Sequence, residues 1–159
     1  MTKKREASLR AGKNVKGGRT FVFDTRLLRC RHVSRKIAVP STFSLYKLAE
    51  VIIDAYGFDF DHAFGFYTNI TEDYYGDSER TYDLFTDMIR RGEDIESTGA
   101  GSVEQTSIAD VWQKPGDRMM MLFDYGDDWR FAVELTAIQE GRSSAMVLES
   151  IGRAPEQYS

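Results

Sequence analysis

Cysteine is almost absent from this chain of 159 residues: Cys30 stands alone, so no internal disulfide can form. A single cysteine fits the reducing cytoplasm, where we expect the protein to reside. No apolar run reaches the length of a membrane-spanning helix, and the N-terminus lacks the apolar segment of a signal peptide. A chain of this length can fold as one domain without a disulfide or a metal ion to stabilise it.

Histidine is also scarce, with only His32 and His62 in the sequence. The common zinc-binding spacings C-x-x-C and H-E-x-x-H are therefore missing. The glycines at 12 and at 99–101 lack the other residues of a P-loop or of a dinucleotide fingerprint. We expect no cofactor and no bound metal, and the sequence predicts no particular reaction.

Positive charge is concentrated near the N-terminus. Residues 1–36 contain twelve lysines and arginines against two acids, a net charge of +10, so the remaining residues carry −14 of the total of −4. Residues 1–19 also have few large apolar side chains, which predicts a flexible basic arm ahead of a single domain over residues 20–159.

A basic arm of this kind is suited to neutralising nucleic-acid phosphates. The alternatives are a solubilising tail, or an arm that folds against its own acidic body. The candidate nucleic-acid-binding residues are Lys3, Lys4, Arg5, Arg10, Lys13, Lys16, Arg19, Arg29, Arg31, Arg35 and Lys36.

The strongest structural signal is a predicted hairpin over residues 119–135. Large apolar residues recur at every second position on both sides of a turn rich in Asp and Gly, the pattern of two strands that share an apolar face. The side chains expected on one face are Met119, Met121 and Phe123 before the turn and Trp129, Phe131, Val133 and Leu135 after it. This apolar face needs a covering element.

A helix over residues 45–56 is predicted to cover that face, because Ser44 can cap its start, Gly57 suits its end, and apolar residues recur between them at helical spacing. Other predicted elements are strands at 20–28, 35–39, 63–67 and 146–151, a helix at 79–91, a short helix capped by Thr106 or Ser107, and a mobile loop at 93–105. This order predicts an α+β fold with a β-grasp-like mixed sheet, covered by one main helix and accompanied by small additional helices.

The segment 123–130 reads Phe-Asp-Tyr-Gly-Asp-Asp-Trp-Arg and resembles the aromatic–Asp–aromatic–Gly–Asp–x–Trp signature of the plasmid pRiA4b ORF-3-like family. The signature residues here are Asp124, Tyr125, Gly126, Asp127 and Trp129. Segments 114–117, 34–40, 44–45, 55–57 and 149–158 also resemble the family, as does His62 followed by Phe64 and Phe66. The resemblance extends over residues 20–158.

This resemblance implies an α+β fold and an association with mobile elements, but no established activity and no catalytic residue. The chain departs from the family pattern in three places. Ser34 and Arg35 stand where the family often has tryptophan and arginine, Tyr125 replaces a phenylalanine, and residues 68–105 match poorly.

The three aspartates of this segment, Asp124, Asp127 and Asp128, allow two interpretations. A carboxylate cluster can bind a hard cation, whereas aspartates around a glycine commonly build the turn itself; the absence of a calcium-loop motif favours the turn.

His62 next to Asp61 could act as a general base oriented by a carboxylate, although a packed, hydrogen-bonded histidine is the commoner case. Cys30 lies among basic residues that favour its thiolate, without a resolving cysteine.

Three functions stay open. The first, which we expect, is a non-catalytic module that binds a protein partner within a mobile-element system, without membrane contact. The second is an RNA- or DNA-associated protein anchored by residues 3–36. The third is a metal-dependent hydrolase that uses the Asp124–Asp128 turn, which the turn interpretation disfavours.

Overall fold

The computed structural model describes residues 18–71 and 77–158. These residues form one mixed sheet in the order β5-β4-β3-β6-β7-β1-β2-β8, in which only the pair β4–β5 is parallel. The strands are β1 (Arg19–Leu27), β2 (Ser34–Pro40), β3 (Phe64–Tyr67), β4 (Thr81–Asp83), β5 (Gly101–Ser102), β6 (Arg118–Phe123), β7 (Trp129–Glu140) and β8 (Met146–Ile151). The helices are α1 (Leu45–Ala55), α3 (Leu84–Arg90) and α4 (Ile108–Val111). The predicted α+β class and mixed sheet are confirmed.

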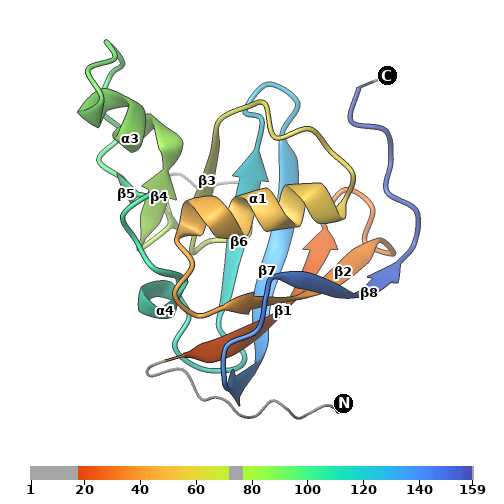
Figure 1. Cartoon of the computed structure of the whole chain (residues 1–159). Coiled ribbons are helices and arrows are strands. Elements are labelled where there is room, and N and C mark those ends of the chain that lie inside the picture. The colour runs from red at the N-terminus through yellow and green to blue at the C-terminus, as the bar shows by residue number, and fades with distance from the viewer. Residues whose placement is uncertain (1–17, 72–76, 159) are drawn as a thin grey trace.

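Helix α1 forms where its sequence signals place it and lies across one face of the sheet (Figure 1). The Ser44 hydroxyl caps the first turn by accepting the Lys47 backbone N–H at 3.2 Å. Gly57 follows the helix with a φ of +76°, a left-handed conformation that glycine adopts without a steric penalty. The side chains that α1 buries are Leu45, Leu48, Ala49, Ile52 and Ile53.

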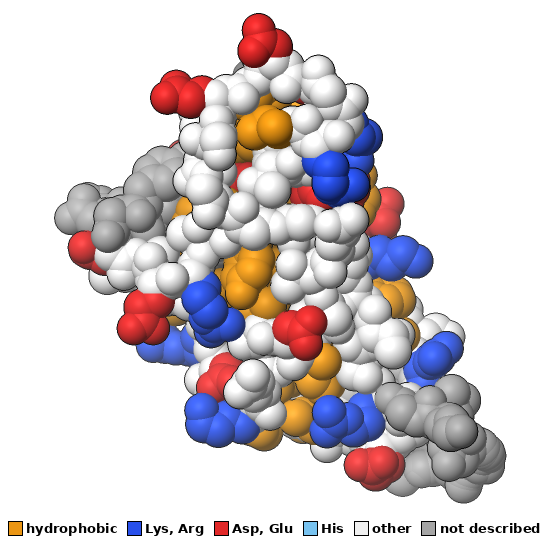
Figure 2. Space-filling view, turned by 90° about the vertical axis from the view of Figure 1, so that its left-hand side faces the viewer, with side chains coloured by type: hydrophobic (Ala, Val, Ile, Leu, Met, Phe, Trp, Pro, Cys, Tyr) orange, Lys and Arg blue, Asp and Glu red, His pale blue; other side chains and the backbone are white. Residues whose placement is uncertain are grey.

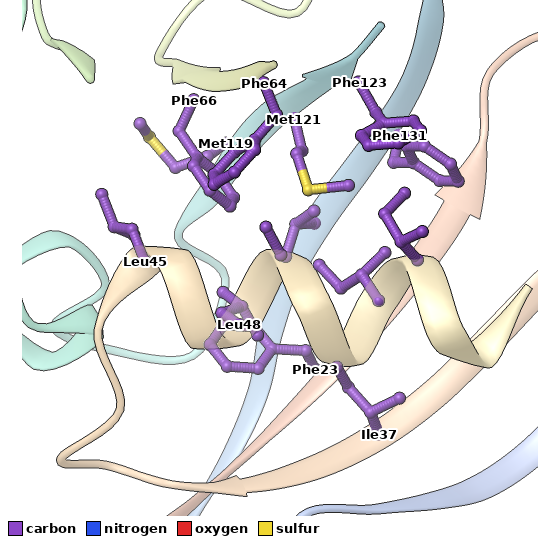
Figure 3. Close-up of a cluster of buried hydrophobic side chains, with 14 of the residues drawn as sticks. Phe23, Ile37, Leu45, Leu48, Phe64, Phe66, Met119, Met121, Phe123 and Phe131 are labelled. Atoms are coloured by element: carbon purple, nitrogen blue, oxygen red, sulfur yellow. The ribbon is translucent and has the colours of Figure 1, made fainter. Parts of the chain in front are cut away.

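The predicted hairpin supplies the other half of the core. In the β6–β7 register, Met121 lies opposite Phe131 and Phe123 lies opposite Trp129. Figure 3 shows side chains from β6 and β7 meeting those of α1, with Phe23 of β1 joining the same layer. Burial of this apolar surface is the main source of stability for such a sheet-and-helix layer.

The opposite face of the sheet carries a smaller apolar cluster. Tyr67, Met120 and Leu122 are buried there, with Leu28 and Ile70 packed beside them. Alternate residues of β3 and β6 therefore point into two different clusters, which explains why all four residues of β3 are buried.

The helix predicted over residues 79–91 is wrong in its first part. Residues 81–83 form β4, which pairs with β3, and the helix α3 begins only at Leu84. The buried Asp83 separates the two elements, because its Oδ1 caps α3 by accepting the Thr86 N–H at 3.0 Å, and its Oδ2 accepts the Thr98 hydroxyl at 2.8 Å. An N-cap residue has non-helical backbone, so α3 does not extend back past Asp83.

The predicted mobile loop at 93–105 is also wrong in part, since Gly101–Ser102 forms β5 beside β4. The fully buried Asp87 carboxylate organises this segment by accepting the Ser102 hydroxyl at 2.5 Å, the Val103 N–H at 2.9 Å and the Arg90 guanidinium at 2.6 Å. Burial by itself would raise the pKa of Asp87, but these hydrogen bonds lower it below the usual value. Glu104 adds ion pairs with Arg90 and Arg91 at 3.2 and 2.7 Å.

We expect Ile52→Ala to lower the free energy of unfolding by about 2–5 kcal/mol, because it removes a fully buried aliphatic side chain and leaves a cavity. Urea denaturation followed by circular dichroism measures this loss. Glu50→Ala, on the exposed side of the same helix, is the control and should change stability by less than about 0.5 kcal/mol. Small, equal losses for both variants would contradict the packing of α1 on the sheet.

Candidate functional site

The turn between β6 and β7 depends on Asp124 and Asp128. Asp124 is buried with a φ of +67°, and its Oδ1 accepts the backbone N–H groups of Gly126 and Asp127 at 3.1 and 3.2 Å. Asp128, with a φ of +60°, donates its own N–H to the Asp124 carbonyl at 2.6 Å. Aspartate tolerates the left-handed region better than most residues. The turn interpretation is therefore confirmed for Asp124, whose side chain accepts two backbone N–H groups of the turn.

An arginine from the β1–β2 connection braces the same turn. The Arg29 guanidinium donates to the carbonyl oxygens of Asp127 and Asp128 at 2.6 and 3.2 Å, and it lies 4.1 Å from the centre of the Trp129 ring. The Asp128 carboxylate accepts Arg130 Nε at 2.8 Å. The Trp129 indole N–H is buried without an acceptor among the described residues, which nothing in the structure explains.

Signature residue Tyr125 projects toward β3. Its hydroxyl lies 2.7 Å from the Tyr67 hydroxyl, and its ring centre lies 5.1 Å from that of Phe85. A Cβ atom on Gly65 would come within 2.6 Å of the Tyr125 hydroxyl and 2.8 Å of the Tyr82 carbonyl oxygen. Glycine at position 65 is therefore required for this close approach.

The second oxygen of Asp124 faces His62, and this contact was not predicted. His62 Nε2 lies 3.3 Å from Asp124 Oδ2, 3.6 Å from Asp61 Oδ1 and 2.9 Å from the Tyr158 hydroxyl. Tyr158 donates its one proton to Asp61 Oδ2 at 2.8 Å, so its contact with His62 requires the imidazole N–H as donor. This hydrogen bond to Asp61 raises the pKa of Tyr158 to about 12.

The same cluster fastens the end of the described chain. The Gln157 side-chain amide brackets the backbone of Asp59, accepting its N–H at 2.7 Å and donating to its carbonyl at 3.1 Å. Tyr158 then engages Asp61 and His62 beside it. The polar atoms of the cluster thus bind other groups of this chain. Their arrangement supports attachment of the C-terminal tail rather than proton transfer to a substrate.

Arg35 has a comparable internal role although the sequence suggested an exposed contact residue. Its buried guanidinium donates to the carbonyls of Ala55 at 3.0 Å, Ile151 at 3.0 Å and Gly152 at 3.1 Å. It also lies 5.0 Å from the centre of the Tyr56 ring. A cation at the C-terminal end of α1 complements the helix dipole, and here it also joins the helix to the end of β8.

The remaining basic candidates lie apart from one another. Arg19 opens β1 near the Phe21 ring, Arg31 is exposed in the connection after β1, and Lys36 is half-buried on β2 opposite Asp24. The candidates in the arm lie outside the described residues; these are Lys3, Lys4, Arg5, Arg10, Lys13 and Lys16. The described residues therefore place no dense group of basic candidates at one surface site.

A different surface stands out at the edge of the sheet. All six residues of β8 are exposed, and its four apolar side chains, Met146, Val147, Leu148 and Ile151, are each 46–50% exposed. The end of the molecule with α3 and α4 differs: Figure 2 shows charged side chains of both signs scattered there, with only small apolar areas between them. Sequence reasoning found the β8 strand but missed its exposure, because strand length and composition do not reveal an edge.

Among the described residues, no helix is long and apolar enough to cross a membrane.

We expect Asp124→Ala to lower the free energy of unfolding by about 1–3 kcal/mol, because two backbone N–H groups lose their acceptor. Asp124→Asn should retain most of the stability, since the asparagine oxygen can accept the same bonds and tolerates the left-handed conformation. Urea denaturation of both variants measures the difference. Equal losses would mean that the negative charge beside His62, rather than the turn, is what stabilises this site.

Because of Tyr56, we expect the stability of the folded state to fall at alkaline pH. Burial raises its pKa to about 12, from an ordinary value of 10.0. The folded state therefore keeps the phenolic proton longer than the unfolded chain does, so this contribution to stability is complete below pH 10 and is lost as the pH rises toward 12.

Replacing Tyr56 by phenylalanine removes that titration. Between pH 9 and pH 11, we expect the wild type to lose about 1 kcal/mol more stability than the Tyr56→Phe variant does. Urea denaturation midpoints at several pH values give the comparison. Parallel pH profiles for the two proteins would contradict the burial of this hydroxyl in the folded state.

The chain is similar to a known protein family and to a solved structure. A model of the family described as plasmid pRiA4b ORF-3-like protein matches residues 26–157. The crystal structure of MM3350 from Methanosarcina mazei Go1, a protein of unknown function, superimposes with a TM-score of 0.68 at 14% sequence identity, covering 89% of this chain and 74% of that one. A search of curated protein sequences found no match. Because the family model spans most of the described residues, this chain belongs to the plasmid pRiA4b ORF-3-like protein family.

Proposed function

We propose that the protein is a non-catalytic binding module that recruits a partner protein by adding an extended segment of that partner to β8. The observation that carries this proposal is the exposed apolar edge of the sheet. Scattered apolar residues are ordinary on protein surfaces, whereas four within one six-residue edge strand are typical of an interaction site.

The hydrogen-bonding pattern of β8 supports strand addition. Among the described residues, β8 is last in the sheet order and pairs with β2 alone, so the backbone groups on its outer side face away from the sheet. An added strand gains affinity from main-chain hydrogen bonds and specificity from alternate side chains. Val147 lies across from Ile37 of the core, and Met146 lies across from Ala38, so both faces of an added strand would meet apolar side chains.

The composition of β8 also favours the addition of a strand at this edge. Glu149 is the one charged residue of β8, and in the sheet it stands opposite Lys36. Protective edge strands usually carry lysine or proline, and β8 carries neither. The opposite edge of the sheet, β5, has two residues only and offers a partner little backbone to pair with.

The sequence also predicted a mobile-element system and a cytoplasmic location, and both stay part of this proposal. We propose that the partner belongs to a mobile-element system and that the two proteins meet in the cytoplasm, which the single cysteine supports. We also interpret the framework as β-grasp-like, since the β1–β2 hairpin leads into α1 and β1 then pairs with β7 in the middle of the sheet.

Nucleic-acid association is the alternative function, and the observation in its favour is the charge of +10 over residues 1–36. Two of its candidate residues, Arg29 and Arg35, already bind backbone carbonyls of this chain. Contact would therefore depend on the arm, with Arg19, Arg31 and Lys36 as the described candidates. Of the aspartates considered for a hydrolase, Asp124 builds the β6–β7 turn and Asp128 binds Arg130, so these described contacts do not favour that function.

The test begins with capture of partners from a native lysate that has been treated with nuclease. Each captured protein is then purified and its affinity for the wild type is measured against a variant with Val147→Lys and Leu148→Lys. We expect affinity to fall at least about tenfold, because the side chains of the added strand would lie beside two charges in place of two apolar groups. The matched control carries Gln113→Lys and Gln139→Lys, which add the same charge at exposed positions outside β8.

A purified partner that binds the β8 variant and the wild type equally would contradict strand addition. Capture that disappears after nuclease treatment, or after removal of residues 1–17, would favour the nucleic-acid alternative. Circular dichroism of each variant verifies that lost binding is not lost folding.

A further inference from the structure

We propose that a groove along the outer side of α1 binds a basic, partly apolar segment of a partner protein. The groove is lined by Glu50, Val51 and Asp54 of α1 and by Phe58, Asp59 and Phe60 of the connection that follows the helix. These residues do not belong to β8, so this inference does not rest on the proposed function.

The floor of the groove is apolar and fixed in place by the core. Phe58 is buried against the Trp129 ring, with ring centres 4.9 Å apart. Phe60 is half-buried and stacks on Phe123, with ring centres 6.0 Å apart and planes 13° apart. Since these rings are held by buried neighbours, the groove exists before a ligand arrives, which reduces the ordering cost of binding.

The rim of the groove is acidic. Glu50, Asp54 and Asp59 are all exposed, and none of these carboxylates forms an ion pair with another described residue. The single lysine of α1, Lys47, extends instead over the Phe43 ring, 5.4 Å from its centre. The part of the chain that the structure describes places no lysine or arginine in the lining of the groove.

This combination selects the chemistry of the occupant. Aromatic side chains at the floor accept aliphatic groups and also attract cations through their faces. The carboxylates at the rim complement ammonium or guanidinium groups, and Glu50 and Asp54 are one helical turn apart, so two basic residues can be engaged together. A segment with basic residues flanking a large apolar side chain satisfies both requirements.

A neighbouring hollow extends the same surface. It shares Phe60 and continues past Asp61 and Tyr46 toward Met88. The Tyr46 ring centre lies 5.3 Å from that of Phe60, so the aromatic floor is continuous between the two hollows. The surface is thus long enough for a chain segment to pass along it, rather than for a single side chain alone.

The test uses a short fluorescent peptide in which lysine and leucine alternate, titrated with the full-length protein in about 50 mM salt. Fluorescence anisotropy reports binding. We expect Asp54→Asn combined with Asp59→Asn to weaken binding about fivefold or more, because two carboxylates at the rim are neutralised. The control combines Asp94→Asn with Glu96→Gln, two exposed acids outside the groove, and should change affinity less than about twofold.

Two further measurements distinguish peptide binding in the groove from binding at β8 and from general attraction to an acidic protein. The Val147→Lys and Leu148→Lys variant should bind the peptide like the wild type, whatever its effect on strand addition. A peptide with serine in place of leucine should bind at least about fivefold more weakly, since it cannot use the aromatic floor. Equal losses in the groove variant and the charge control, or no loss in the groove variant, would overturn the proposal.

Discussion

The packing of α1 against the apolar face of β6 and β7 is the contact on which the other features of the molecule depend. It buries five side chains of the helix and fixes both of its ends. At the first end, the backbone N–H groups of Leu45 and Tyr46 donate to the carbonyls of Thr106 and Val103 at 3.0 and 2.9 Å, which ties the helix to the segment after β5. At the other end, the Ala55 carbonyl accepts Arg35, which also holds the end of β8. One helix therefore positions both the inserted segment and the C-terminal tail.

The elements predicted from sequence share one property: their signals are local. The apolar residues at helical spacing between Ser44 and Gly57 define α1, and large apolar residues at every second position around an Asp-rich turn define the hairpin. The errors lie where a distant partner decides the structure. Residues 81–83 become a strand because β3 offers them a hydrogen-bonded edge, and residues 101–105 are ordered because the buried Asp87 accepts their hydrogen bonds. Helical periodicity carries no information about either partner.

The candidate site illustrates the same distinction. The turn-forming role of Asp124 could be predicted, since aspartates around a glycine have that role in many turns. Its second contact, with His62, joins residues far apart in the chain, and Tyr158 arrives from the end of the sequence. Arginine shows the limit most clearly: Arg29 and Arg35 contribute to the basic composition of residues 1–36, yet each is bound to backbone carbonyls of this chain. Composition records the charge of a residue but not the group that the residue binds.

The exposed edge of β8 is central to the functional proposal, and residue-specific amide hydrogen exchange of the free protein tests it most directly. If β8 is an open edge strand, its amides that point toward β2 should be protected, while those that point outward should exchange at nearly the rate of an unstructured chain. Uniform protection along residues 146–151 would contradict the account, because it would mean that another segment or another molecule already covers this edge.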